Sequence, residues 1–466
     1  MNEFLPKNEE KTNLEMLPIN NSMLISPLTK VNVRTNYLQV NAISNLLCLF
    51  LMVCGFVLPL LGFTGQILGL ILEFVLIVLL AGFILSKKQK STKFFFYIGF
   101  LIGGEIFFRN FVHLNIPGYM IVEYAIIGIG VLNIPKAISL IRLKTNIPLL
   151  LWTIFCFYAA VTLLYSPDPY KGRWFLSIFI SGLVILNLSV SMGSANHSVE
   201  IGKGTALGVC LIFGLLLNYE VFHPVAERFG HGINSSVQNA IFLTIGVIFL
   251  VIITKKLKLR WYKYLLPIIA LTLGSAFTFS RGPLLGALVA VIAILLSGNK
   301  FSAKVQNLLT FIIVIGIIAA IVFNVAPDQF TARFIGISLD TERAGIWEGA
   351  MAAWKDAPIL GWGIGSWSTI YPRYSWMNPS APLTISDAHN IFLQILVETG
   401  LIGITIFTLF LLSILARITR SKSFEQIGLF GYLLAVGFVD NWKILIFFTL
   451  FGYILMNEKK NSPRDN

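Results

Sequence analysis

Apolar runs of membrane-spanning length recur along most of the chain, separated by short polar connections. A helix needs about 20 mainly apolar residues to cross the hydrocarbon core of a bilayer. The pattern therefore predicts an all-α, polytopic helical membrane protein with about 12–14 transmembrane helices. The predicted spans are 42–62, 65–85, 94–110, 119–135, 147–165, 174–191, 200–217, 238–254, 264–279, 283–297, 305–325, 389–415, 424–439 and 441–456.

The polar segments divide the chain into five predicted regions. A polar cytoplasmic tail covers 1–41, and transmembrane helices 1–11 cover 42–325. Residues 326–388 form one large extracytoplasmic loop, the C-terminal transmembrane helices cover 389–456, and a second cytoplasmic tail covers 457–466. No short apolar run ends in a small-residue cleavage site, so we expect no signal peptide.

Composition and charge support this interpretation. Hydrophobic residues make up 56% of the chain and charged residues only 12%, against about 25% charged in a soluble domain. With a cytoplasmic N-terminus, 25 of the 35 lysines and arginines fall on the cytoplasmic side, as the positive-inside rule requires. The net charge of +13 is therefore a topology signal and predicts no nucleic-acid partner.

His389 lies where the large polar loop meets a new membrane helix. Its imidazole titrates near neutral pH, which suits proton transfer on a lipid-linked substrate at the membrane surface. Asp387 has two open roles, orienting His389 or capping the helix. Asn390, Gln394 and Glu398 follow one turn apart on one face, and we expect them to face the bundle interior, Gln394 and Glu398 as structural contacts.

Few basic residues fall on the outer face, so each of them is informative. Arg281 sits between two apolar runs so closely spaced that they predict a tight helical hairpin, in which Gly282 permits the turn and Pro283 starts the next helix. A catalytic arginine and one that extends to lipid headgroups are both open for Arg281.

Arg343 lies in the first turn of the amphipathic segment 342–355, predicted to be a helix along the membrane surface. A surface helix alone would also explain Arg343. Arg173, Arg228 and Arg373 are the further outer arginines that we expect to contact phosphate or sugar.

The glycine-rich segment 358–365 lacks the strand and helix of a nucleotide-binding motif, so we interpret it as a close-packed turn. The outer loops contain no Asp-x-Asp motif, and the histidines have no metal-ligand spacing. We therefore expect neither a metal nor another cofactor.

In their order around one large outer loop, these motifs resemble the O-antigen ligase and O-antigen polymerase superfamily of bacterial envelopes. The resemblance covers roughly residues 166–440. It is carried by Ser166-x-Asp168-Pro169, the segment Arg228-Phe229-Gly230-His231-Gly232-Ile233-Asn234, Ser280-Arg281-Gly282, Arg343-x-x-x-Trp347, Pro358-x-x-Gly361-x-Gly363 and His389-Asn390-x-x-Leu393-Gln394-x-x-x-Glu398-x-Gly400-x-x-Gly403.

The resemblance implies a type C glycosyltransferase-like fold and an O-antigen or exopolysaccharide polymerase or ligase. Such an enzyme moves a glycan from undecaprenyl diphosphate to an acceptor hydroxyl, on a glycan or a lipid-linked acceptor. The resemblance also implies contact with membrane lipids and a site on the extracytoplasmic face of a bacterial plasma (inner) membrane.

The family's essential histidine maps onto His389, and its diphosphate-binding arginines map onto Arg281 and Arg343. The mechanism hypothesis is a metal-independent, inverting displacement, with His389 as the base that accepts the proton of the acceptor hydroxyl.

Three alternatives stay open at this point. A membrane transporter or lipid-linked glycan flippase is the rival outside the enzyme class, because glutamates lie within predicted spans. A protein O-oligosaccharyltransferase is the rival within it. Polymerase and ligase carry the same motifs, so the sequence does not separate them.

Overall fold

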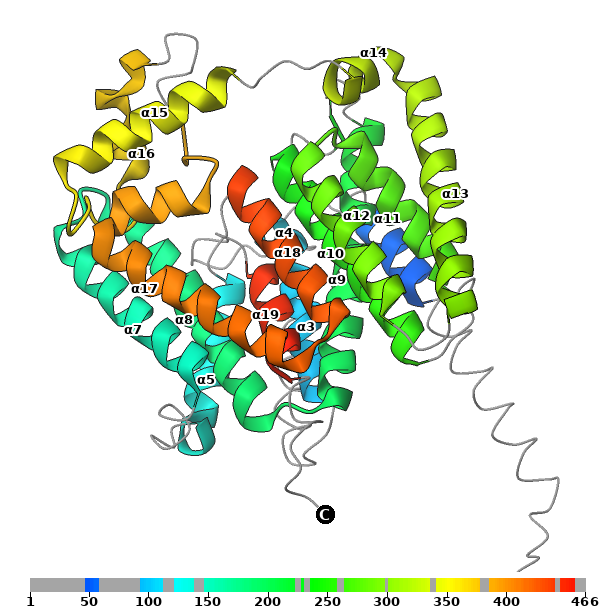
Figure 1. Cartoon of the computed structure of the whole chain (residues 1–466), viewed down its shortest axis with the longest axis horizontal. Helices are drawn as coiled ribbons and strands as arrows, with labels where there is room; N and C mark the ends of the chain where they lie inside the picture. Colours follow the sequence, from blue (N-terminus) through cyan, green and yellow to red (C-terminus); the bar gives the residue numbers. More distant parts are fainter. Residues whose placement is uncertain are drawn as a thin grey trace, which may run out of the picture. The chain divides into compact units, whose positions relative to one another are not determined.

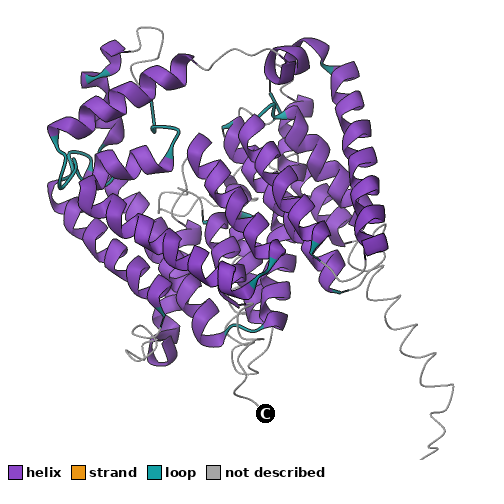
Figure 2. Ribbon diagram, in the orientation of Figure 1, coloured by secondary structure: helices purple, strands orange, loops and turns teal. Residues whose placement is uncertain are grey.

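The computed structural model describes residues 47–57, 93–111, 121–137, 146–222, 228–229, 235–257, 264–297, 301–335, 341–377, 385–440 and 445–456. Within these ranges every regular element is a helix and none is a strand (Figure 2). The predicted all-α fold class is thereby confirmed.

Six described helices are long and apolar enough to cross a membrane. They are α7 (Ile147–Thr162, continued by η2, Leu163–Tyr165), α8 (Pro169–Met192), α9 (Ala195–Phe222), α10 (Ser236–Lys256), α13 (Phe301–Val325) and α17 (Ile391–Ser421). Shorter apolar helices are Leu47–Val57, α3 (Lys93–Gly103), α11 (Leu265–Phe277), α12 (Arg281–Leu296), α18 (Phe424–Val439) and α19 (Ile446–Met456). The remaining membrane-region helices are α4 (Glu105–Phe111) and α5 (Ile121–Ala137).

These helices coincide with the predicted spans wherever the structure describes them, which confirms a polytopic helical protein. The predicted span 65–85 and the two tails, 1–41 and 457–466, lie outside the described residues. The region boundaries and the orientation across the membrane stay predictions.

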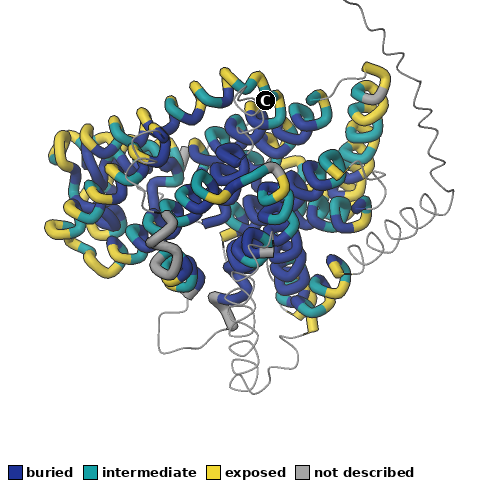
Figure 3. Tube along the Cα trace, turned by 90° about the horizontal axis from the view of Figure 1, so that it is seen from below, coloured by how far each residue is buried: buried dark blue, intermediate teal, exposed yellow. Residues whose placement is uncertain are grey.

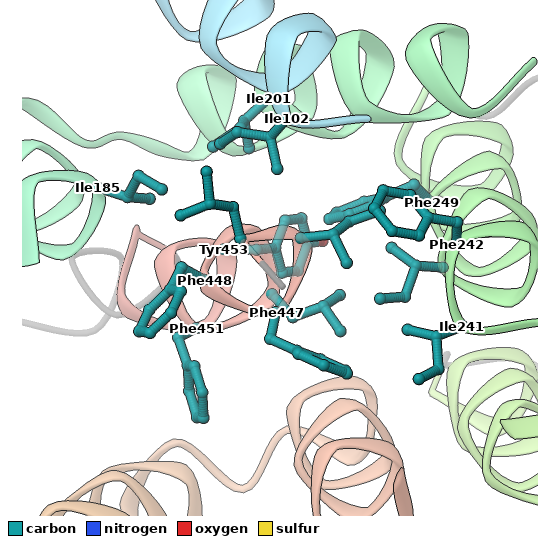
Figure 4. Close-up of a cluster of buried hydrophobic side chains, with 14 of the residues drawn as sticks. Ile102, Ile185, Ile201, Ile241, Phe242, Phe249, Phe447, Phe448, Phe451 and Tyr453 are labelled. Carbon is teal, nitrogen blue, oxygen red and sulfur yellow. The ribbon is translucent and has the colours of Figure 1, made fainter. Parts of the chain in front are cut away.

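The helices at the centre of the bundle are apolar and buried on all of their faces. In α19 all of Ile446–Met456 is buried, and α10 is buried along most of its length, as expected of helices surrounded by other helices. Figure 3 shows the buried positions running through the interior of the bundle. The side chains that meet there include Ile185, Ile241, Phe242, Phe249, Phe447, Phe448, Phe451 and Tyr453 (Figure 4).

Small residues let α12 and α18 approach closely along their length. A methyl group on Gly282 would lie 2.3 Å from Val439 Cγ2, and one on Gly428 would lie 2.5 Å from the Ala293 methyl. Glycine at such contacts allows backbones to pack within membranes. The start of α12 therefore lies beside the end of α18.

The segment 326–388, predicted to be the large extracytoplasmic loop, is mostly helical where the structure describes it. It contains α14 (Pro327–Phe330), η4 (Thr331–Ile335), α15 (Thr341–Asp356), α16 (Trp367–Ile370), η5 (Tyr371–Arg373) and η6 (Ser375–Met377). Helix α15 packs on α17, as the reader can follow in Figure 1.

The predicted helix at 342–355 is confirmed as α15, but its apolar face packs on protein. Ile346, Ala350 and Ala353 are buried against Trp367, Tyr371 and neighbouring side chains. The periodicity that suggests a membrane-surface helix reflects a small second core, because an apolar stripe looks the same in sequence whether lipid or protein covers it.

Helix α17 bends at Gly400, whose φ of 63° interrupts the helical backbone. Just after the bend, Leu401 N donates to Pro358 O at 2.9 Å. Just before it, Val397 O and Glu398 O accept from Trp362 N and Gly363 N at 3.0 and 2.8 Å. The segment 358–365 is thus a close-packed turn, as predicted, held to α17 by backbone hydrogen bonds.

Candidate active site

His389 is presented on a strained turn immediately before α17. Its φ of 48° lies in the left-handed region, which costs a residue other than glycine about 1–2 kcal/mol. Asp387 Oδ1 accepts a hydrogen bond from His389 N at 3.2 Å and stabilises this turn. Asn390 caps the helix, with its side chain accepting from Phe392 N and Leu393 N. Of the two roles left open for Asp387, the cap therefore belongs to Asn390.

The imidazole of His389 faces two carboxylates. Its Nδ1 lies 3.2 Å from Asp387 Oδ1 and 3.9 Å from Asp440 Oδ1. Asp440 follows the last residue of α18 and is only 3% exposed. With the hydrogen on the ring nitrogen that faces the carboxylates, Nε2 is the proton acceptor.

The surroundings of His389 act on its pKa in opposite directions. Burial, the largest influence, lowers the pKa because it disfavours the charged ring. The Asp440 carboxylate, through its contact and its charge, and the Asp387 carboxylate raise the pKa, while the positive charge of Arg343 lowers it. The balance leaves the pKa of His389 above its ordinary value of 6.5.

Helix α15 brings Arg343 to this centre and also fixes the loop that carries His389. Trp347, one turn after Arg343, donates from Nε1 to Ala388 O at 3.1 Å. Arg343 is half-buried and lies within electrostatic range of His389. One helix therefore sets the positions of both a guanidinium group and the histidine.

Gln394 and Glu398 support the same loop from α17. Gln394 Oε1 accepts from Ala388 N at 2.8 Å, and Gln394 Nε2 donates to Glu398 Oε1. Glu398 Oε1 also accepts from Trp367 N at 3.4 Å. Both side chains are buried, and their hydrogen bonds link the histidine loop to the segment that carries Trp367.

Arg281 is the first residue of α12, at the predicted tight hairpin. The positive φ of that turn belongs to Phe279, at 51°, and not to Gly282. The expectation that Gly282 permits the turn is therefore wrong, and its lack of a side chain instead admits Val439. Through this contact the start of α12 lies beside Val439, the residue before Asp440.

Arg228 lies near the same hairpin, because Phe229 N donates to Phe277 O at 3.2 Å. The structure thus brings Arg343, Asp387 and His389 together and places the backbone of Arg281 next to the Asp440 end of α18.

Arg173 and Arg373 lie by the glycine turn. Arg173 is exposed on α8, where its neighbour Gly172 is so close to Gly365 that a methyl group on Gly365 would lie 2.6 Å from Gly172 Cα. Arg373 is exposed and lies over the Trp362 ring, 5.7 Å from its centroid. Neither arginine is among the groups that shift the pKa of His389.

Sequence reasoning missed Asp440. It falls between the last two predicted spans, where it reads as part of their connection. An acidic residue flanked by two apolar runs is costly to bury and is therefore a usable signal. Its partner His389 is remote in sequence, and only the packing of α18 reveals the pair.

Asp387, His389 and Asp440 each offer one ligand atom, and these atoms lie within 4.8 Å of one another. Two carboxylates and an imidazole are a donor set that can hold a divalent cation. The absence of a metal requirement therefore stays a prediction.

A comparison with protein families finds a match. The O-antigen ligase family model matches residues 266–408, about a third of the chain. The matched stretch runs from α11 through the Arg281 hairpin, α15 and the glycine turn to His389 and α17. No curated protein matches the chain. Residues 266–408 are therefore similar to the O-antigen ligase family, and the resemblance seen in the sequence motifs is supported for this part of the chain.

Proposed function

We propose that the protein is a membrane glycosyltransferase that moves a glycan from undecaprenyl diphosphate to an acceptor hydroxyl on the extracytoplasmic face of a bacterial plasma membrane. The observation that carries the proposal is the His389 centre: an imidazole whose Nδ1 faces two carboxylates, with Arg343 in electrostatic range. The family match at residues 266–408 supports the same reaction class.

In this proposal His389 Nε2 takes the proton of the acceptor hydroxyl. The hydroxyl oxygen attacks the anomeric carbon, and the bond from that carbon to the diphosphate oxygen breaks with inversion. A positioned base of this kind contributes about 10²–10⁴ to the rate. The raised pKa of His389 makes the ring a stronger base, while Asp387 and Asp440 stabilise the imidazolium that forms.

Arg281 and Arg343 bind the diphosphate in this scheme. The leaving group gains negative charge as the bond breaks, and a guanidinium can bind its oxygens through two parallel hydrogen bonds. Arg228, near the Arg281 hairpin, is a further candidate contact. Arg173 and Arg373, at the glycine turn, are assigned to a more distal part of the glycan.

The test uses purified protein in detergent, a polyprenyl-diphosphate-linked glycan and a panel of glycan, lipid-linked and peptide acceptors. We expect transfer by the wild-type protein and a loss of about 10²–10⁴ in the His389→Ala variant. The control is His197→Ala, which removes a histidine in the first turn of α9. Transfer in detergent would exclude transport as the sole activity, and wild-type rates in His389→Ala would refute the proposed base.

A further inference from the structure

A cavity of about 290 Å³ is bounded by α10, α11, α12 and α13. Its walls are almost entirely apolar, with Ala287, Leu288 and Ile318 among them. The hydroxyls of Thr244 and Thr272 in the wall are bonded to carbonyl oxygens of their own helices, and Ser275 adds one further hydroxyl. The cavity therefore offers few polar groups to a ligand and would recognise it mainly by packing, which suits a hydrocarbon chain.

The cavity begins close to Arg281. On α12 it is lined from Leu284, one turn after Arg281, to Val291, a stretch that ends about 15 Å from Arg281 along the helix. On α11 its lining reaches Ala276, at the end of the helix that leads into the hairpin. A chain in the cavity would thus have one end about one helical turn from Arg281.

Helix α13 gives this cavity a boundary toward lipid. Only 11% of its 18-residue apolar stretch is buried, the smallest share among the six long apolar helices of the described residues. Most of α13 is therefore free to face lipid on the side away from the cavity. Phe334, from the segment after α13, lines the cavity and lies 6.4 Å, ring centre to ring centre, from Phe279 in the hairpin.

We propose that this cavity holds the first isoprene units of the donor's lipid carrier, with the diphosphate at Arg281. The inference rests on the proposed function and adds a site for the lipid. The occupant follows from the pairing of an apolar cavity with a cation at its end, which fits an anionic head on a branched hydrocarbon. The volume is about twice that of a ~150 Å³ apolar cavity that binds benzene, enough for on the order of two isoprene units.

Transfer from bilayer to cavity gains little hydrophobic energy, because lipid tails are already apolar. Recognition must therefore come from packing, and a larger side chain in the cavity should interfere. Ala319 and Ala320 provide a matched pair, since Ala319 lines the cavity and the neighbouring Ala320 is exposed on α13.

The first readout is photolabelling in nanodiscs with a polyprenyl diphosphate that carries a diazirine on its second isoprene unit. We expect label on cavity residues of α12 and α13, removed by excess undecaprenyl diphosphate and not by phosphatidylglycerol. Ala319→Trp should lower this label about tenfold, Ala319→Leu should lower it less, and Ala320→Trp should leave it unchanged. Label spread evenly over the exposed face of α13, or equal in the two Trp variants, would overturn the inference.

The second readout is glycan transfer from a full-length donor and from an analogue with a two-unit chain too short to anchor elsewhere. A wild-type protein that labels at the cavity but transfers no glycan would refute the proposed function and keep the lipid site. Normal transfer by Ala319→Trp, with unchanged KM for the full-length donor, would refute the lipid site and keep the function.

Discussion

The His389 centre and the glycine turn both contact the same helix, α17, and they are built in opposite ways. The His389 centre gathers ionisable groups from three elements, with a strained backbone and side-chain contacts. The glycine turn at 358–365 has no ionisable group of its own and is fixed by backbone hydrogen bonds around Gly400. The His389 centre therefore supplies the ionisable groups for the proposed chemistry. The glycine turn fixes α17, the helix that follows His389.

The comparison predicts that the arginines near the His389 centre contribute more to glycan transfer than the arginines that lie beside the glycine turn. Arg281→Lys and Arg343→Lys should each lower kcat/KM by about 10²–10³, because lysine retains the charge but loses the planar pair of donors. The matched controls, Arg173→Lys and Arg373→Lys at the glycine turn, should change it by less than about threefold. Equal losses in all four variants, measured by transfer in detergent, would remove the distinction.

A substitution at Gly400, where the glycine turn is bonded to α17, should lower the stability of the protein more than its transfer activity. Gly400→Ala forces a positive φ on alanine and puts a methyl group 2.2 Å from Ile359 O, so we expect a loss of more than about 2 kcal/mol. Gly316→Ala is the control, since a methyl group there meets nothing within 4 Å and alanine favours a helix. Thermal aggregation in detergent measures both, and similar midpoints would show that the bend is not needed.

A substitution at Asp440 tests whether its carboxylate controls the pKa of His389. The neutral ring is the proposed base, so activity should fall as pH drops through the raised pKa of His389. Asp440→Asn removes a carboxylate that raises this pKa, so the acid limb of the kcat/KM profile should move to lower pH, with a plateau about tenfold lower.

Asp328→Asn, at an exposed position on α14, is the control for this profile. An acid limb that stays in place in Asp440→Asn, with only the protein yield reduced, would assign Asp440 a structural role and no part in the titration of His389.

The sequence predicted the helices well because membrane spans are a property of local composition. It also located the Arg281 hairpin and the helix that carries Arg343. It did not identify what covers α15, because an amphipathic stripe does not reveal its partner, and the structure supplies Trp367 and Tyr371.

The candidate site was predicted only in part for a similar reason. Asp387 and His389 are neighbours in sequence, and their contact follows from a short turn. Asp440 reaches His389 only because α18 ends beside it, and the close approach of Gly282 to Val439 is likewise visible only after folding. Long-range packing, and not residue type, was the missing information.

The glycine turn holds α17 on both sides of the bend at Gly400. Before the bend, Val397 O and Glu398 O accept from Trp362 N and Gly363 N, and after it Leu401 N donates to Pro358 O. The first part of α17 also packs on α18, through the rings of Phe392 and Phe438. The bend is therefore fixed by its contacts, so the distance from His389 to Asp440, and with it the basicity of the ring, is set by the packing of these two helices.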